Sequence, residues 1–231
     1  MRTLLYVPII HTSADLGSLA KEVTQRGIKD LGEEIWKKHE ETVLGFWNIL
    51  MKYFDSIEVA GVKIYQDGMI ANGEIGQKIV EEGVRSGSKN YEVISRLLQK
   101  GGVLVKTEDF HFVREERNRL LKITQATTIV GKLLWLIRYK LTKNSLLNKR
   151  DNFISKRVDE TLNEGERGII FIGAYHNIKH RLSGDIKIIE IKDSEKIRAY
   201  HKLLPFYHKY KDRIEELRRY ILSEVDLPWQ G

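Results

Sequence analysis

The sequence predicts one α/β domain over residues 1–231: a mostly parallel sheet of about five strands, flanked by helices. Short apolar runs alternate with longer segments of helical periodicity, and such an alternation implies parallel crossovers. Hydrophobic residues make up 42% of the chain, which is enough for a full core and argues against global disorder. No linker divides the 231 residues, so a single domain is expected.

The N-terminal half begins with residues 3–10, whose leucine and β-branched side chains predict a buried strand. A helical pattern follows over residues 16–54, and Gly27 and Gly32 are expected to divide it into a short and a long helix. Residues 57–65 alternate as a second strand.

Residues 74–100 are helical in pattern, with breaks expected at Gly83 and Gly87. A short apolar strand is predicted next, over residues 103–109. About fifty residues of helical pattern come after it and form a helical insertion over about 113–163, before the fourth core strand. A break is expected within the insertion near Asn144.

Residues 168–174 are uniformly apolar, as in a strand that is buried on both faces. Residues 186–191 alternate enough to lie at the edge of the sheet. The pattern over residues 194–224 predicts one or two C-terminal helices, broken near Pro205.

The positive charge is concentrated in the helical insertion. The chain has a net charge of +7, yet residues 114–157 hold twelve Lys and Arg against three acidic residues. This region could engage an anionic partner, either a lipid surface or nucleic acid. Trp135 lies among aliphatic residues with Lys132, Arg138 and Lys140, which is the composition of a helix in peripheral contact with a membrane. The alternative is a helix that packs on the sheet with its charges facing water. Nucleic acid is the less expected partner, because no aromatic-basic repeat suggests base stacking.

Composition also excludes several classes of chemistry. The chain has no cysteine, which rules out disulfides, iron–sulfur clusters and thiol nucleophiles. It has no phosphate-binding glycine loop and no GxSxG elbow. No stretch is apolar enough to predict a signal peptide or a membrane span, so we expect a cytoplasmic protein. The absence of cysteine, three methionines and 31% charged residues also suit a thermostable protein.

Two histidines follow apolar strands at opposite ends of the chain. His11 ends the run TLLYVPIIH, and His176 ends the strand that contains Gly173. Open α/β sheets place their chemistry at the carboxyl ends of the strands. The two imidazoles therefore suit acid/base transfer or metal ligation. The alternative is that each caps a strand end through a backbone hydrogen bond.

Carboxylates follow the two strands between these histidines. Asp67 comes after the second predicted strand, and Glu108 ends the third, with Asp109 as a weaker alternative. In a parallel sheet they share one edge with the histidines, where a carboxylate orients an imidazole, acts as a general base or completes a metal site. The alternative for each is a solvated loop acid or a helix cap.

The segment from residue 148 to residue 178 resembles the TraB/Tiki group and the related erythromycin esterase and ChaN-type heme-uptake proteins. In those families an arginine-containing helix precedes an apolar strand that ends in Gly-x-x-His; the matching residues are Arg150, Gly173 and His176. The families carry an earlier Gly-x-x-His, where this chain has Pro8-Ile-Ile-His11, so the histidine matches and the glycine does not. The middle of the chain matches only in layout.

The resemblance implies a hydrolase. Its arginine, Arg150, would bind a carboxylate or stabilise an oxyanion, whereas the composition alone is equally consistent with a surface charge. The acid that the families place after their second strand would be Asp67 or Glu108.

We therefore expect a hydrolase acting on a small molecule or a peptide through His11, His176, a carboxylate and Arg150. In a metal-assisted version His11, His176 and Asp67 hold a divalent ion, namely Mn, Co or Zn. In a metal-free version one histidine deprotonates water. The rival interpretations are a non-enzymatic protein whose basic helices 114–157 bind an anionic partner, and a binder of heme or another small ligand through His176. Trp- and Tyr-rich helices also leave room for a homodimer.

Overall fold

A computed structural model describes residues 1–12, 14–15, 20–125, 129–227 and 229, without the side chains of residues 123–141. In this described part, five strands form one all-parallel sheet in the order β3-β2-β4-β1-β5. The predicted α/β class is confirmed, and the fifth strand lies at an edge as expected. The strands are β1 (Arg2–Ile9), β2 (Lys63–Gln66), β3 (Val103–Val105), β4 (Arg167–Gly173) and β5 (Ile186–Glu190).

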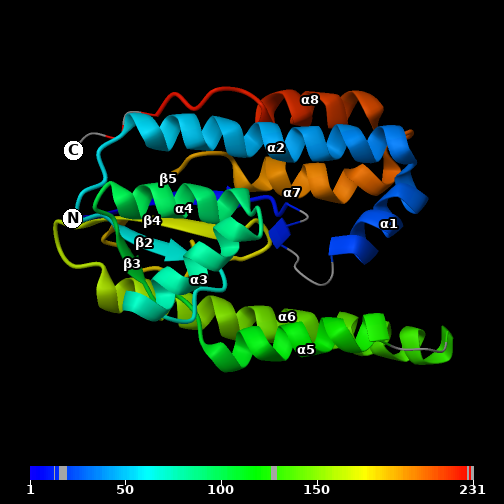
Figure 1. Ribbon diagram of the computed structural model, residues 1–231, viewed down its shortest axis with the longest axis horizontal. Helices are drawn as coiled ribbons and strands as arrows, with labels where there is room; N and C mark the ends of the chain where they lie inside the picture. Colours follow the sequence, from blue (N-terminus) through cyan, green and yellow to red (C-terminus); the bar gives the residue numbers. More distant parts are fainter. Residues whose placement is uncertain (13, 16–19, 126–128, 228, 230–231) are drawn as a thin grey trace.

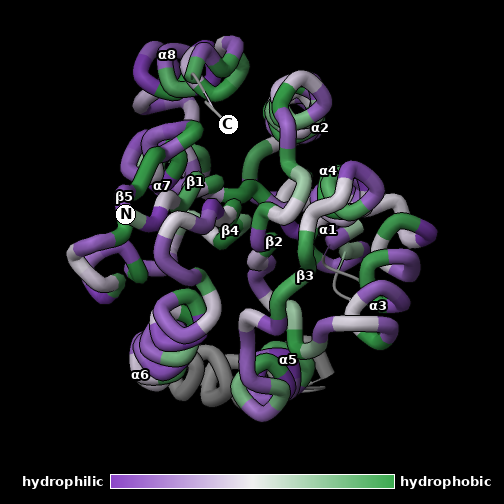
Figure 2. Tube along the Cα trace, turned by 90° about the vertical axis from the view of Figure 1, so that its left-hand side faces the viewer, coloured by the Kyte–Doolittle hydropathy of each residue, from purple (hydrophilic) through white to green (hydrophobic). Residues whose placement is uncertain are grey.

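Helices cover both faces of the sheet. Helices α2, α4, α7 and α8 lie on one side, and α6 lies on the other with α5 beside it (Figure 1; Figure 2). The helix bounds are α1 (Ala20–Leu31), α2 (Glu33–Ser56), α3 (Gly73–Arg85), α4 (Lys89–Gln99), α5 (Phe110–Gln125), α6 (Ile129–Thr161), α7 (Ser194–Leu203) and α8 (Lys211–Ile221), with a 3-10 turn at Leu204–Phe206.

The alternation of side chains along the strands divides the core into two layers. In β1, Leu5 and Val7 pack toward α2 and α4, whereas Leu4 and Tyr6 pack toward α6, because successive residues of a strand point to opposite faces. The first layer is centred on Phe46, Trp47, Leu50 and Phe171. The second contains Ile154, Val158, Leu162, Ile170 and Ile172. Together the layers bury both faces of the central strands.

The strand order brings the functional candidates to one place. β1 and β4 are parallel neighbours, with Ile9 opposite Gly173, so the chain that leaves each strand emerges at the same edge. β2 pairs with the other side of β4, and β3 pairs with β2. The carboxyl ends of four strands therefore surround a common position, as expected for a parallel sheet.

Some element boundaries differ from the prediction. Gly27 lies inside α1, and the division falls at Gly32, whose φ of 85° favours glycine. The second strand begins only at Lys63, because Gly61, with a φ of 73°, makes a turn before it. Gly83 lies inside α3, so the helix ends nearer Gly87.

The insertion is a pair of helices, α5 and α6, that extends beyond the sheet (Figure 1). The break expected near Asn144 is wrong, since α6 continues through this residue and Leu146 is buried two residues later. The proposed membrane-contacting side chains, Lys132, Trp135, Arg138 and Lys140, lie outside the described ones. Within the described helices, none combines the length and apolarity needed to cross a bilayer.

Candidate functional site at the carboxyl edge of the sheet

The loops after β2 and β3 deliver two carboxylates to the edge. Asp67 follows β2 directly, and its backbone N–H donates to Phe171 O of β4 at 2.8 Å. Glu108 follows β3 by three residues, and its N–H donates to Met69 O at 2.9 Å, which ties the two loops together. Asp109 takes a different role: its side chain accepts the N–H of His111 at the start of α5. Of these acids, the structure brings Asp67 and Glu108 into the site.

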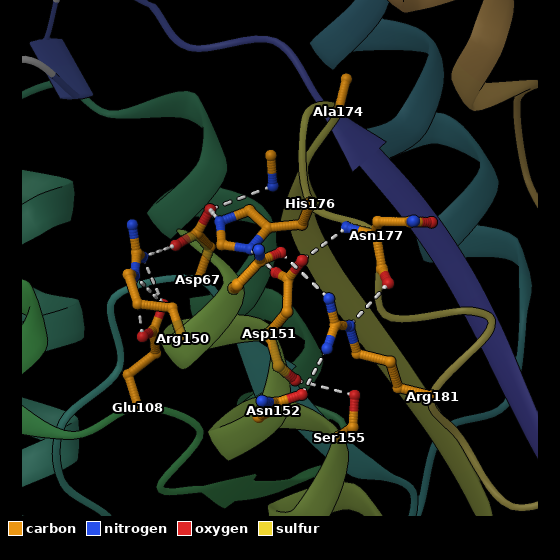
Figure 3. A network of polar contacts seen from close by, with 12 residues as sticks. Asp67, Glu108, Arg150, Asp151, Asn152, Ser155, Ala174, His176, Asn177 and Arg181 are labelled. Atoms are coloured by element: carbon orange, nitrogen blue, oxygen red, sulfur yellow. Dashed lines mark hydrogen bonds and ion pairs between the residues drawn. The ribbon is translucent and has the colours of Figure 1, made fainter. Parts of the chain in front are cut away.

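Helix α6 contributes an arginine that joins the carboxylates. Arg150 Nη2 donates to Asp67 Oδ1 at 2.6 Å, and Nε donates to Glu108 Oε2 at 3.0 Å (Figure 3). Nη2 also donates to Glu108, and Nη1 donates to Glu116 of α5. Arg150 is buried, so it is not a solvated surface charge. It holds three carboxylates around one guanidinium.

His176 lies between two carboxylates. Its Nδ1 is 2.5 Å from Asp151 Oδ1, and its Nε2 is 3.3 Å from Asp67 Oδ2 (Figure 3). Asp151 Oδ2 accepts the backbone N–H of Asn177 at 2.9 Å, which fixes the carboxylate against the loop. His176 is therefore bound through its side chain to Asp151, and it is not a strand cap held only by backbone contacts.

The local charges determine the protonation of the site. Burial disfavours a charged imidazole, but Asp67 and Asp151 outweigh it and raise the pKa of His176 to about 10. Burial, assisted by Asp67, raises the pKa of Glu108 to about 7, although Arg150 opposes this. For Asp67, burial is outweighed by His176 and Arg150, which hold its pKa well below the usual range. At neutral pH the cluster thus holds two cations among its carboxylates.

Gly173, at the end of β4, lies directly beside the side chains of Asp67 and His176. A Cβ built on this glycine would lie 3.1 Å from Asp67 Oδ2, 3.4 Å from His176 Cδ2 and 3.9 Å from His11 Nε2. His11, which follows β1, is exposed, and its ring lies near the same glycine. All five predicted residues, His11, Asp67, Glu108, Arg150 and His176, are thereby brought to one edge.

The donor set in the cluster fits a divalent cation. Asp67, Glu108 and His176 each offer a ligand atom, and these atoms lie within 4.8 Å of one another. Asp151 behind the imidazole is the arrangement that orients a metal-ligating histidine. Four linked carboxylates against one guanidinium and one imidazole also leave excess negative charge. The ligand set expected from the sequence is His11, His176 and Asp67, whereas the group of close donor atoms among the described residues is that of Asp67, Glu108 and His176.

The other histidines are not in the cluster. His180 is exposed on the loop after β4, and His208 is exposed after α7. His201 lies in α7, whereas His208 lies between α7 and α8. His39 packs on Trp36 and Tyr200. None of them adds a ligand to the group formed by Asp67, Glu108 and His176 among the described residues.

Sequence reasoning missed two acids, Asp151 and Glu116. A signal for Asp151 was present, because it lies three residues before Ile154 and seven before Val158, on the stripe of α6 that packs against the sheet. A charged residue on a buried stripe requires a partner, and for Asp151 this is His176. Glu116 lies one helix away on α5, and no spacing in the sequence connects it with Arg150.

Comparison of the chain with models of protein families, with curated proteins and with solved structures finds no match in any of the three. The chemistry of the site is therefore argued from its geometry.

Proposed function

We propose that this chain is a hydrolase of the TraB/Tiki-like or erythromycin-esterase-like kind, acting on a small molecule or a peptide. The observation that carries the proposal is the position of His176, held by Asp151 and facing Asp67 beside Gly173. Buried titratable groups with displaced pKa values at the carboxyl edge of a parallel sheet are typical of active sites.

Asp67, Glu108 and His176 would hold a divalent ion in this site. Carboxylate and imidazole ligands without sulfur suit Mn, Co or Zn. Such an ion, when bound, lowers the pKa of a coordinated water and polarises the bond under attack. Asp151 would keep the Nδ1 proton of His176, and the ion would displace the proton on Nε2, so that Nε2 becomes the ligand atom.

His11 is the exposed member of the set, so it is the group best placed to meet substrate and water. In the proposed reaction its imidazole takes a proton from water as the water oxygen bonds to the acyl carbon. The bond from that carbon to the leaving oxygen or nitrogen then breaks, and the proton passes to the leaving group. Arg150 keeps Asp67 and Glu108 in place throughout, through the contacts described above.

The test is a panel of p-nitrophenyl esters, lactones and fluorogenic peptides, assayed with Mn²⁺, Co²⁺ or Zn²⁺. We expect hydrolysis that His176→Ala reduces at least a hundredfold, and that the exposed-histidine controls His180→Ala and His208→Ala leave within about twofold. Activity that survives in His176→Ala, or Mn²⁺ binding that is unchanged in it, overturns the proposal.

A second candidate function rests on the basic surface of the α5–α6 pair. Arg114, Arg117, Lys143 and Lys149 are exposed, on helices that extend beyond the sheet (Figure 1). They would bind an anionic lipid surface or nucleic acid without catalysis. Binding to vesicles of anionic lipid or to nucleic acid that falls steeply with salt, in a protein without hydrolytic activity, supports this candidate.

The geometry does not favour heme ligation by His176. Its Nε2 faces Asp67 Oδ2 at 3.3 Å and its Nδ1 is bound to Asp151, so an axial bond would require Asp67 to be displaced.

A further inference from the structure

The loop that carries His176 is held from the side opposite to Asp151 by an arginine of α7. Arg198 Nη2 donates to the backbone oxygen of His176 at 2.7 Å, and its Nε donates to the backbone oxygen of Ala174. Its Nη1 donates to Glu195 at 2.6 Å, on the outer side of the helix. Only 16% of the Arg198 side chain is exposed, so its two bonds to the loop are largely shielded from water.

The backbone and the ring of His176 are both held by hydrogen bonds. The N–H of His176 donates to Gly173 O at 2.9 Å, its oxygen accepts from Arg198, and its ring is bound to Asp151. The next peptide N–H, from Asn177, donates to the same aspartate. A ring held only through Nδ1 could still tilt about that bond, whereas the fixed backbone determines where Nε2 points.

Helix α7 contacts the same loop a second time. His201, three residues after Arg198, stacks on Tyr175 with ring centroids 6.2 Å apart and planes at 24°. Arg198 therefore grips the backbone of the loop while His201 supports the side chain beside it. Among the described residues, the contacts of Arg198 and His201 do not include the carboxylates that surround His176.

We propose that Arg198 is a positioning residue, which fixes the backbone at Ala174 and His176 so that the imidazole stays aimed at Asp67 and Glu108. The inference concerns the site of the proposed hydrolase and rests on that function for its catalytic meaning. The competing explanation is that Arg198 only fastens α7 to the sheet; that role predicts a loss of stability without any change at His176.

The experiment compares Arg198→Ala and Arg198→Lys with Glu195→Ala, which removes the outer ion pair and keeps both bonds to the loop. For each full-length variant we would measure Mn²⁺ affinity by electron paramagnetic resonance and the thermal midpoint by circular dichroism. The resonance of the proton between His176 Nδ1 and Asp151 would be recorded by NMR and assigned by its loss in His176→Ala.

We expect Arg198→Ala to weaken Mn²⁺ binding about tenfold and to shift or broaden the His176 resonance. Arg198→Lys, which keeps the charge but loses the planar fork of donors, should fall between Arg198→Ala and the wild type. Glu195→Ala should stay within about twofold of the wild type, with the resonance unchanged. An Arg198→Ala protein that folds and keeps both the affinity and the resonance overturns the inference. If that variant does not fold, Arg198→Lys decides, and wild-type values for it overturn the inference.

The failure of this inference can be distinguished from failure of the proposed function. The NMR readout needs neither metal nor substrate. If the wild type binds no Mn²⁺ and hydrolyses none of the probes, the resonance alone decides whether Arg198 positions His176.

Discussion

Histidines on the two sides of the sheet have pKa values that are displaced in opposite directions. His176, which faces α6, contacts Asp151 and Asp67, and its pKa is raised to about 10. On the α2 and α7 side, burial lowers the pKa of both His39 and His201 to about 4, with further opposition to His201 from nearby His39 and His11.

The neighbours explain the difference. His39 bonds to the Tyr200 hydroxyl at 3.0 Å and packs on Trp36, and His201 stacks on Tyr175. None of these contacts supplies a negative charge, so the cost of burying an imidazolium is not offset there. The acidic region around Asp67, Asp151 and His176 therefore stabilises a positive charge. The aromatic region around His39, Tyr200 and His201 disfavours one.

The largest expected effect comes from removing the cation at the centre of the acidic region. Arg150→Met leaves Asp67, Glu108 and Glu116 without their shared partner. We expect the free energy of unfolding to fall by about 3–5 kcal/mol. Urea denaturation measures this. The exposed neighbour supplies the control, since Lys149→Met should change stability by less than about 0.5 kcal/mol. Equal stability of the two variants would mean that the acidic region does not depend on Arg150.

The aromatic region should respond to acid. Between the unfolded pKa of about 6.5 and the folded value of about 4, the unfolded state binds more protons at His39 and His201. Their contribution to stability is therefore complete above pH 6.5 and is lost as the pH falls toward 4. His201→Phe keeps an aromatic ring and cannot titrate. Between pH 6.5 and pH 4 its free energy of unfolding should therefore fall less than that of the wild type, by on the order of 2 kcal/mol. Denaturation at a series of pH values checks this, with exposed His208→Gln as control; parallel curves for all three would contradict it.

The acidic region can be altered more gently at the partner of His176. Asp151→Asn removes the charge behind the imidazole, and we expect Mn²⁺ affinity to fall by about 10–100-fold. Titration followed by electron paramagnetic resonance measures this. Asp226→Asn, at an exposed carboxylate near the C-terminus, should have no effect. Wild-type affinity in Asp151→Asn would remove Asp151 from the site.

The smallest effect is expected at Gly173, which lies beside Asp67 and His176. In Gly173→Ala the new methyl group would press on Asp67 at 3.1 Å, and the neighbours must move by a few tenths of an ångström. We expect a several-fold loss of Mn²⁺ affinity and a cost of about 1 kcal/mol in stability. Gly184→Ala is the matched control, because no heavy atom lies within 4 Å of its Cβ position and its φ is not positive. If both variants behave alike, the absence of a side chain at Gly173 has no functional meaning.

The placement of the candidate residues could be predicted because it depends on strand ends. His11, Asp67, Glu108 and His176 each follow an apolar run, and a parallel sheet puts such ends at one edge. The roles within the cluster could not be predicted in the same way. The close donors include Glu108, whose loop is tied back to Met69 by a contact that no sequence pattern reveals.

The partners from helices were harder to find. Arg150 was a candidate only through the family resemblance, since a lone arginine in a basic helix gives no sign of burial. Arg198 binds backbone oxygens, which every residue carries, so the sequence has no complementary charge to mark its target. The break expected in α6 is wrong for a different reason. Asparagine and serine disfavour a helix only mildly, and tertiary packing outweighs such a preference.

The insertion of β4 between β1 and β2 has a consequence for the order of events during synthesis. Both neighbours of β1, namely β4 and β5, come from the last third of the chain. A nascent chain that has emerged only through α5 can pair β2 with β3 but leaves β1 without either native neighbour. β4 can pair with β1 and β2 only after it has left the ribosome as far as Gly173. Pairing between strands so far apart in the sequence is slow. β1 is thus among the last strands of this sheet to be paired, and until then its unpaired backbone is open to chaperones and to other chains.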